Sequence, residues 1–104
     1  MFEKDLLKNK TVIVTGGGTG LGKSMAKQFG LLGAKLSICG RRKEVIDAAV
    51  QELKETEAEV LGVQCDVRSG EDVQRMINET VSTLGPVNVL LNNAAGNFIS
   101  PTER

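Results

Sequence analysis

The sequence predicts an α/β fold in which a doubly wound parallel sheet of four strands, in the order 3-2-1-4, is covered by three helices. Four short apolar runs alternate with three helical patterns, and this alternation is typical of βαβ units with parallel strands. Glycines between Gly16 and Gly22 separate the first run from the first helical pattern. Right-handed crossovers then give that strand order, and ligands are expected at the carboxyl ends of the strands.

Each element is predicted from its own pattern, in chain order. Strands are expected at the apolar runs near Thr11–Thr15, Lys35–Cys39, Val60–Cys65 and Val87–Asn92. Apolar stripes at helical spacing should face the sheet; they are Leu21, Met25, Phe29 and Leu32, then Val45, Ile46, Ala49, Val50 and Leu53, then Val73, Met76, Ile77, Thr80, Val81 and Leu84. Gly33 should end the first helix, Ser69 should cap the third with Asp72 three residues on, and Gly85-Pro86 should end it.

The composition limits what this protein can be. The 104 residues suffice for one domain, and 13 basic residues balance 13 acidic ones, so nothing suggests a nucleic-acid partner. The first ten residues carry charges throughout and hold no apolar stretch for a signal peptide or a membrane span, which predicts a soluble cytoplasmic protein. Histidine is absent, and Cys39 and Cys65 lack a metal-site spacing. We therefore expect no metal and two reduced core cysteines.

The run from Thr15 to Ser24 fits two phosphate-binding patterns at once. A dinucleotide loop, T-G-x-x-x-G-x-G, uses Gly16, Gly20 and Gly22, whereas a P-loop, G-x-x-x-x-G-K-S, uses Gly17, Gly22, Lys23 and Ser24. Both need a strand before the turn and a helix after it, because the unpaired N–H groups of a helix N-terminus attract an anion. The hypotheses differ at Lys23, which a P-loop uses on the phosphates and a dinucleotide loop leaves solvated.

The residues after the other strands favour a dinucleotide. Gly40-Arg41-Arg42 stands where an NAD-specific enzyme places an acid on the adenosine ribose, and an arginine there suits a 2′-phosphate, so NADP(H) is the predicted cofactor. Asp66 suits an adenine amino group, or a magnesium ion in a P-loop enzyme. The small residues Ala94-Ala95-Gly96 let backbone lie against a sugar, while Asn92 and Asn93 tie neighbouring strand ends together.

Three motifs, in this order, resemble the short-chain dehydrogenase/reductase family, whose fold is of the Rossmann type. They are TGGGTGLG at residues 15–22, Asp66-Val67, and NNAA at residues 92–95. Within the family, residues 65–68 and 93–104 are similar to the 2,4-dienoyl-CoA reductases of fatty-acid β-oxidation. These reductases share the alanine at Ala95, where the family pattern most often has glycine.

The resemblance implies roles for individual residues. Cofactor binding is implied for the glycine loop and the strand ends, at Gly16, Gly17, Gly18, Thr19, Gly20, Leu21, Gly22, Arg41, Asp66, Val67, Asn93, Ala94 and Ala95. Arg41 would contact the 2′-phosphate, and Asp66 the adenine. Arg68 would meet the acyl-CoA substrate, and Phe98 would line the acyl channel. Asn97 is the implied catalytic contact, a donor that stabilises the enolate oxygen.

The reaction implied by the resemblance is NADPH-dependent reduction of 2,4-dienoyl-CoA to 3-enoyl-CoA. The family's Tyr-x-x-x-Lys motif follows later elements, and this sequence contains no tyrosine. We therefore expect residues 1–104 to form the NADP-binding N-terminal half of a reductase domain, from a protein that is a homo-oligomer when full length. The alternatives are an enoyl-CoA or 3-oxoacyl reductase, an inactive nucleotide-binding fragment, and a P-loop nucleotide hydrolase.

Overall fold

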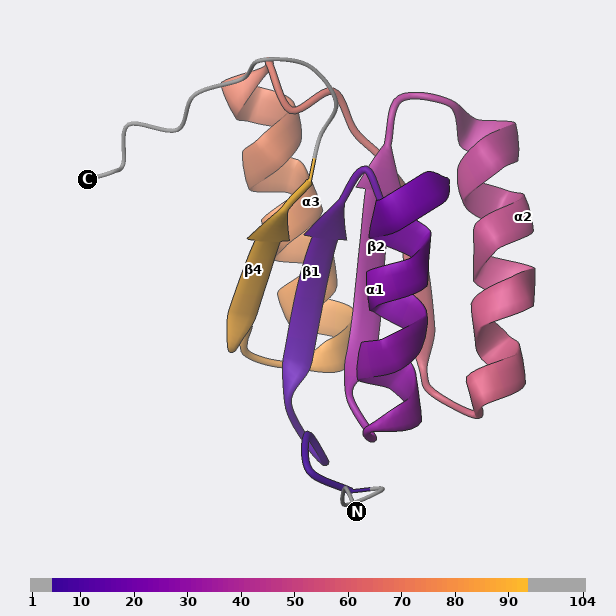
Figure 1. Cartoon of the computed structure of the whole chain (residues 1–104). Coiled ribbons are helices and arrows are strands. Elements are labelled where there is room, and N and C mark those ends of the chain that lie inside the picture. Colours follow the sequence, from indigo (N-terminus) through magenta and orange to yellow (C-terminus); the bar gives the residue numbers. More distant parts are fainter. Residues whose placement is uncertain (1–4, 94–104) are drawn as a thin grey trace.

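The computed structural model describes residues 5–93, which form a four-stranded parallel sheet with helices on both faces (Figure 1). In chain order the elements are β1 (Thr11–Thr15), α1 (Gly20–Leu31), β2 (Lys35–Gly40), α2 (Lys43–Leu53), the 3-10 helix η1 (Lys54–Thr56), β3 (Val60–Gln64), α3 (Gly70–Leu84) and β4 (Val89–Asn92). The strand order is β3-β2-β1-β4, which confirms the predicted fold. All four strands run in the same direction in Figure 1, so the segments that follow them lie together at the carboxyl end of the sheet.

The apolar core lies in two layers, one on each face of the sheet. Helices α1 and α2 cover one face, where Val12 and Val14 are buried, and α3 covers the other, where Met76 joins Ile13 (Figure 1). Side chains alternate along a strand, so β1 contributes to both layers and all five of its residues are buried. This continuous apolar run is typical of a central strand in a parallel sheet.

The predicted helix ends are confirmed. Gly33 follows α1 with φ of 99°, and Gly85 follows α3 with φ of 103°, and both angles lie in the left-handed region that favours glycine. The hydroxyl of Ser69 accepts a hydrogen bond from the backbone N–H of Asp72 at 3.2 Å, which is the expected N-cap of α3.

Four details of the fold differ from the sequence prediction. Two apolar residues expected to face the sheet are exposed instead, Leu21 on α1 (66%) and Val81 on α3 (43%). The other two differences concern the ends of elements. Strand β4 begins at Val89 rather than Val87, because the side-chain oxygen of Asn88 accepts the backbone N–H of Thr11 at 2.8 Å and replaces a strand-to-strand bond. The second helix continues into the 3-10 turn η1, which ends at Glu57 with φ of 70°. A glutamate is an unusual residue for that left-handed conformation, so no local signal marks this end.

Both cysteines are buried free thiols, as predicted. Burial raises the pKa of Cys39 to about 12, with a further contribution from neighbouring Cys65, and burial also raises the pKa of Cys65. The reactive thiolate form is therefore disfavoured in the folded chain, and the two residues serve packing.

Candidate dinucleotide-binding site

The loop between β1 and α1 leaves no room for side chains on its inner side. Gly16 has φ of 66° and Gly20 has φ of 54°, so both adopt the left-handed conformation. A Cβ atom at Gly22 would collide with the carbonyl oxygen of Gly16 and would lie 2.7 Å from Nδ2 of Asn93. The loop therefore folds tightly over the first turn of α1, next to the end of β4.

The N-terminus of α1 is left open to an anion. Its N-cap residue, Thr19, makes no capping bond with its side chain, and the first turn contains no acidic residue. Helix α3 is the contrast, because Ser69 caps it and its first turn contains Glu71 and Asp72. The unpaired N–H groups and positive dipole end of α1 are thus available to a pyrophosphate.

Arg41 follows β2 with an exposed side chain. Within residues 5–93, its guanidinium makes no ion pair or hydrogen bond, whereas Arg42 lies 3.9 Å from the carboxylate of Glu44. The carbonyl oxygen of Arg41 accepts a hydrogen bond from Nε2 of Gln64 at 3.0 Å. The backbone of Arg41 is therefore held, and its cationic end is available to a phosphate.

Asp66 and Arg68, which were assigned to different ligands, contact each other. Arg68 Nε donates to Oδ1 of Asp66 at 3.1 Å, and its Nη2 donates to Oδ2 at 3.0 Å. The Arg68 backbone N–H also donates to Oδ1 at 3.0 Å. These bonds are the main cause that lowers the pKa of Asp66 to about 2, with Arg41 adding a smaller electrostatic contribution. Asp66 is thus an ionised acceptor at neutral pH.

The ends of β1 and β4 are tied by one threonine. Thr15 Oγ1 donates to the side-chain oxygen of Asn92 at 2.8 Å, and it accepts the backbone N–H of Asn93 at 2.8 Å. This contact agrees with the predicted role of the two asparagines as ties between strand ends. It places Asn93 beside the glycine loop.

Lys23 is not fully solvated, although the dinucleotide hypothesis predicted a solvated ammonium at this position. Its Nζ lies 2.9 Å from Oε1 of Glu52 on α2, and 32% of its side chain is exposed. The ammonium is thereby turned toward the second helix. A P-loop needs that ammonium on the phosphates, so this geometry does not favour the hydrolase hypothesis.

The remaining predicted site residues are placed as follows. The side chain of Leu21 is 66% exposed at the start of α1, and Val67 packs against the core layer under α3. Ala94, Ala95, Asn97 and Phe98 lie outside the described residues.

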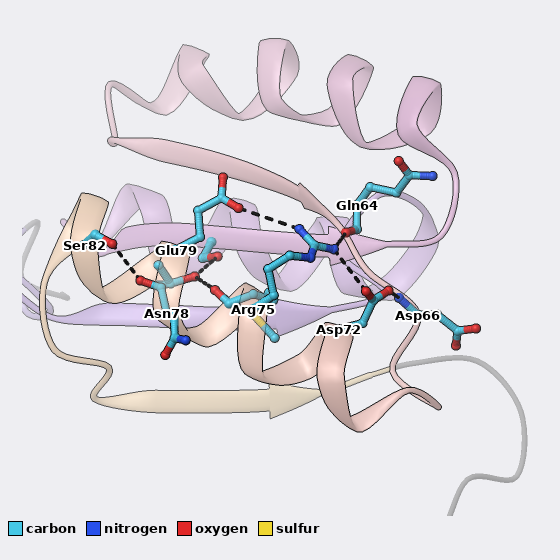
Figure 2. Close-up of polar contacts among 10 residues, drawn as sticks. Gln64, Asp66, Asp72, Arg75, Asn78, Glu79 and Ser82 are labelled. Carbon is cyan, nitrogen blue, oxygen red and sulfur yellow. Dashed lines mark hydrogen bonds and ion pairs between the residues drawn. The ribbon is translucent and has the colours of Figure 1, made fainter.

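A polar network between β3 and α3 was not predicted. Figure 2 shows the guanidinium of Arg75 between Gln64, Asp72 and Glu79, with Asp72 next to Asp66. Asp72 Oδ2 accepts the backbone N–H of Asp66 at 2.9 Å, and this bond is the main cause that lowers the pKa of Asp72. The spacing of Asp72 and Arg75, three residues apart on a helix, was the available signal.

The described residues hold no group of histidine, cysteine or acidic side chains that could bind a metal ion. None of the helices between residues 5 and 93 combines the length and the apolar character needed to span a bilayer.

Comparisons with known proteins agree on one family. The family model described as short chain dehydrogenase matches residues 10–104. The (3E)-enoyl-CoA-producing peroxisomal 2,4-dienoyl-CoA reductase of Arabidopsis thaliana is 39% identical over 102 residues, 98% of this chain and 34% of that protein. The probable (2E)-enoyl-CoA-producing 2,4-dienoyl-CoA reductase of Bacillus subtilis is 42% identical over 98 residues, 94% of this chain and 39% of that protein. The chain thus spans little more than a third of these relatives.

Solved structures of similar proteins show the same architecture. A short chain dehydrogenase from Bacillus anthracis has a TM-score of 0.81 and 45% identity, with 93% of this chain and 39% of that chain covered. L-sorbose reductase from Gluconobacter frateurii, complexed with NADPH and L-sorbose, has a TM-score of 0.84 and 28% identity, with 97% of this chain and 39% of that chain covered.

Proposed function

The chain belongs to the short-chain dehydrogenase family, and from that premise we propose that it supplies the adenosine and pyrophosphate part of an NADP(H) site in a 2,4-dienoyl-CoA reductase. The observation that carries the cofactor choice is Arg41, which follows β2 with an exposed guanidinium that makes no hydrogen bond or ion pair within residues 5–93. The relative from Gluconobacter frateurii was solved with NADPH, which supports this choice.

The residues present fit a dinucleotide. The open N-terminus of α1 and the closely packed glycines of the loop suit a pyrophosphate, for which we propose residues 16–22. Arg41 would bind the 2′-phosphate, and the ionised carboxylate of Asp66, together with Val67, would face the adenine. Asn93, with Ala94 and Ala95, would complete the site. NADPH, when bound, supplies the hydride for the reduction.

Cofactor choice is tested by the ratio of dissociation constants for NADH and NADPH. Replacing Arg41 with alanine removes a charge-assisted hydrogen bond of roughly 1.5–3 kcal/mol. Because the Arg41 side chain is exposed to solvent, we expect a loss of binding free energy near the low end of that range. We expect the ratio to fall about tenfold. Arg42→Ala is the control and should change the ratio less, since Arg42 already contacts Glu44. An unchanged ratio in Arg41→Ala would remove the basis for NADP dependence.

The substrate is proposed from the two dienoyl-CoA reductases that the chain resembles. Their names differ in the product, (3E)-enoyl-CoA in one and (2E)-enoyl-CoA in the other, and we propose 3-enoyl-CoA here. Arg68 would contact the acyl-CoA, with Phe98 in the acyl channel and Asn97 at the thioester oxygen. The N-terminal position of the match in longer relatives supports a cofactor-binding half for residues 1–104, which we propose belongs to a homo-oligomer.

A chimera tests the reaction. Residues 1–93 would replace the matching segment of the Arabidopsis thaliana relative, which is named as (3E)-enoyl-CoA-producing, and the product of 2,4-dienoyl-CoA reduction would be identified by NMR. In this chimera, Arg68→Ala should raise KM for dienoyl-CoA while KM for NADPH stays nearly constant, because a remote substrate contact acts on binding. A change confined to KM for NADPH would assign Arg68 to the cofactor, through its bonds to Asp66. A chimera that binds NADPH but reduces no dienoyl-CoA would contradict the proposed substrate.

A further inference from the structure

We propose that Gln64 is a positioning residue for Arg41 and thereby contributes to the preference for a 2′-phosphorylated cofactor. The inference rests on the proposed function of Arg41. It adds a residue that lies outside the glycine loop and outside the motifs on which the resemblance is based. The observations that carry it are hydrogen bonds that join the ends of β2 and β3 and fasten both to α3.

Gln64 holds the Arg41 segment from the neighbouring strand. It is the last residue of β3 and is in register with Gly40, the last residue of β2. Its Nε2 donates to the carbonyl oxygen of Arg41 at 3.0 Å, and the backbone N–H of Cys65 donates to the carbonyl oxygen of Gly40 at 2.8 Å. The carbonyl groups of Gly40 and Arg41 are therefore both held by residues at or directly after the end of β3.

Helix α3 fixes Gln64 in turn. Arg75 Nη2 donates to the carbonyl oxygen of Gln64 at 2.6 Å, and it lies 3.3 Å from Oδ1 of Asp72. Oδ2 of the same aspartate accepts the backbone N–H of Asp66, and Figure 2 shows Arg75 linked to both Gln64 and Asp72, and Asp72 linked to Asp66. A continuous series of hydrogen bonds thus joins the proposed adenine contact to the backbone of the proposed phosphate contact.

This arrangement bears on cofactor preference because the Arg41 guanidinium makes no hydrogen bond or ion pair within residues 5–93. The position of such a side chain depends on the backbone that carries it. When the backbone of Arg41 is free to move, part of the phosphate interaction is lost to ordering the segment. A ligand without the 2′-phosphate makes no such contact, so its affinity should not depend on Gln64.

The test compares two small ligands of the adenosine half, adenosine 2′,5′-bisphosphate and AMP, by calorimetric titration of the full chain. Gln64→Met keeps the length of the side chain and removes the amide donor. We expect it to weaken binding of the bisphosphate about three- to tenfold, in the range of one neutral hydrogen bond, and to leave AMP unchanged. Gln51→Met, on the exposed surface of α2, is the matched control and should change neither.

Gln64→Glu provides a second variant, because a carboxylate cannot donate to the Arg41 carbonyl and it competes with the phosphate for the guanidinium. It should weaken bisphosphate binding more than Gln64→Met does. Equal weakening of both ligands in either variant would mean a general structural role and would overturn the inference. If the wild-type chain prefers the bisphosphate and Gln64→Met has the same ratio of dissociation constants for AMP and the bisphosphate, the inference about Gln64 is overturned but the proposed cofactor is not. A wild-type chain without that preference would overturn the proposed cofactor as well.

Discussion

At the level of single residues, Gly22 is the glycine with the least room in the loop. A methyl group there would meet the Gly16 carbonyl, and backbone on both sides has to shift. We expect Gly22→Ala to lower the free energy of unfolding by about 1–3 kcal/mol, the range for overpacking, and to weaken dinucleotide binding. Gly70→Ala is the matched control, because a Cβ there meets nothing within 4 Å, and it should stabilise by roughly 0.4–1 kcal/mol. Urea unfolding measures both, and equal stability of the two variants would refute the close approach.

Asp66 offers a second test at this level, through its titration. Its pKa is lowered from 3.8 to about 2, mainly by the side-chain bonds from Arg68. A depressed pKa in the folded state stabilises the fold above the unfolded value, and this contribution is lost as pH falls from about 4 toward 2. In Arg68→Met, the pKa of Asp66 should rise toward its ordinary value, as followed by carbon NMR of the carboxyl group. Arg42→Met should leave it low, and a low pKa in both variants would contradict the pairing.

At the level of elements, the caps of α1 and α3 predict losses of stability of different size for the same kind of change. Ser69 accepts the Asp72 N–H, whereas Thr19 caps nothing with its side chain. Ser69→Ala should therefore cost about 0.5–2 kcal/mol of stability, and Thr19→Ala should cost much less. The midpoints of urea unfolding compare them directly. A larger loss for Thr19→Ala would show that the N-terminus of α1 is capped by its own residue.

The elements were predictable from sequence to within one or two residues, because each depends on local patterns. Residue type alone predicts the helix ends. Glycine after α1 and α3 adopts the left-handed conformation, and the serine before α3 caps that helix with its side chain. The start of β4 and the 3-10 turn η1 were missed, since Asn88 acts through a partner 77 residues away and Glu57, which follows η1, has no residue-type signal.

The candidate site likewise has parts that local sequence predicts and parts that depend on distant partners. The glycine loop and the end of β2 follow from motif and spacing. Side-chain contacts between distant segments, such as Lys23 with the Glu52 carboxylate and Gln64 with the Arg41 backbone carbonyl, depend on rotamers and register, which a sequence pattern does not contain. Arg68 was expected at a substrate, and its bonds to Asp66 emerge only in three dimensions.

At the level of the whole molecule, β4 is one of the two edge strands of the described sheet, the other being β3. In the described part of the chain β4 pairs only with β1, and the Leu90 side chain is 58% exposed. An apolar strand with unpaired backbone groups invites association. We expect the isolated 104-residue chain to self-associate, and Leu90→Lys to shift it toward monomer in sedimentation velocity. Leu31→Lys changes an exposed leucine on α1 and should not; equal behaviour of the two variants would exclude β4 as the associating surface.

The exposed Arg41 guanidinium also has a consequence for the rate at which a ligand binds. The chain has no net charge, so long-range attraction of a polyanion has to come from local positive potential. Arg41 and the N-terminus of α1, whose first turn has no acidic residue, supply this positive potential at the carboxyl end of the sheet. Encounter rates with a phosphorylated ligand should consequently fall as ionic strength rises and the Debye length shortens to about 8 Å at 0.15 M, and more steeply for NADPH than for NADH.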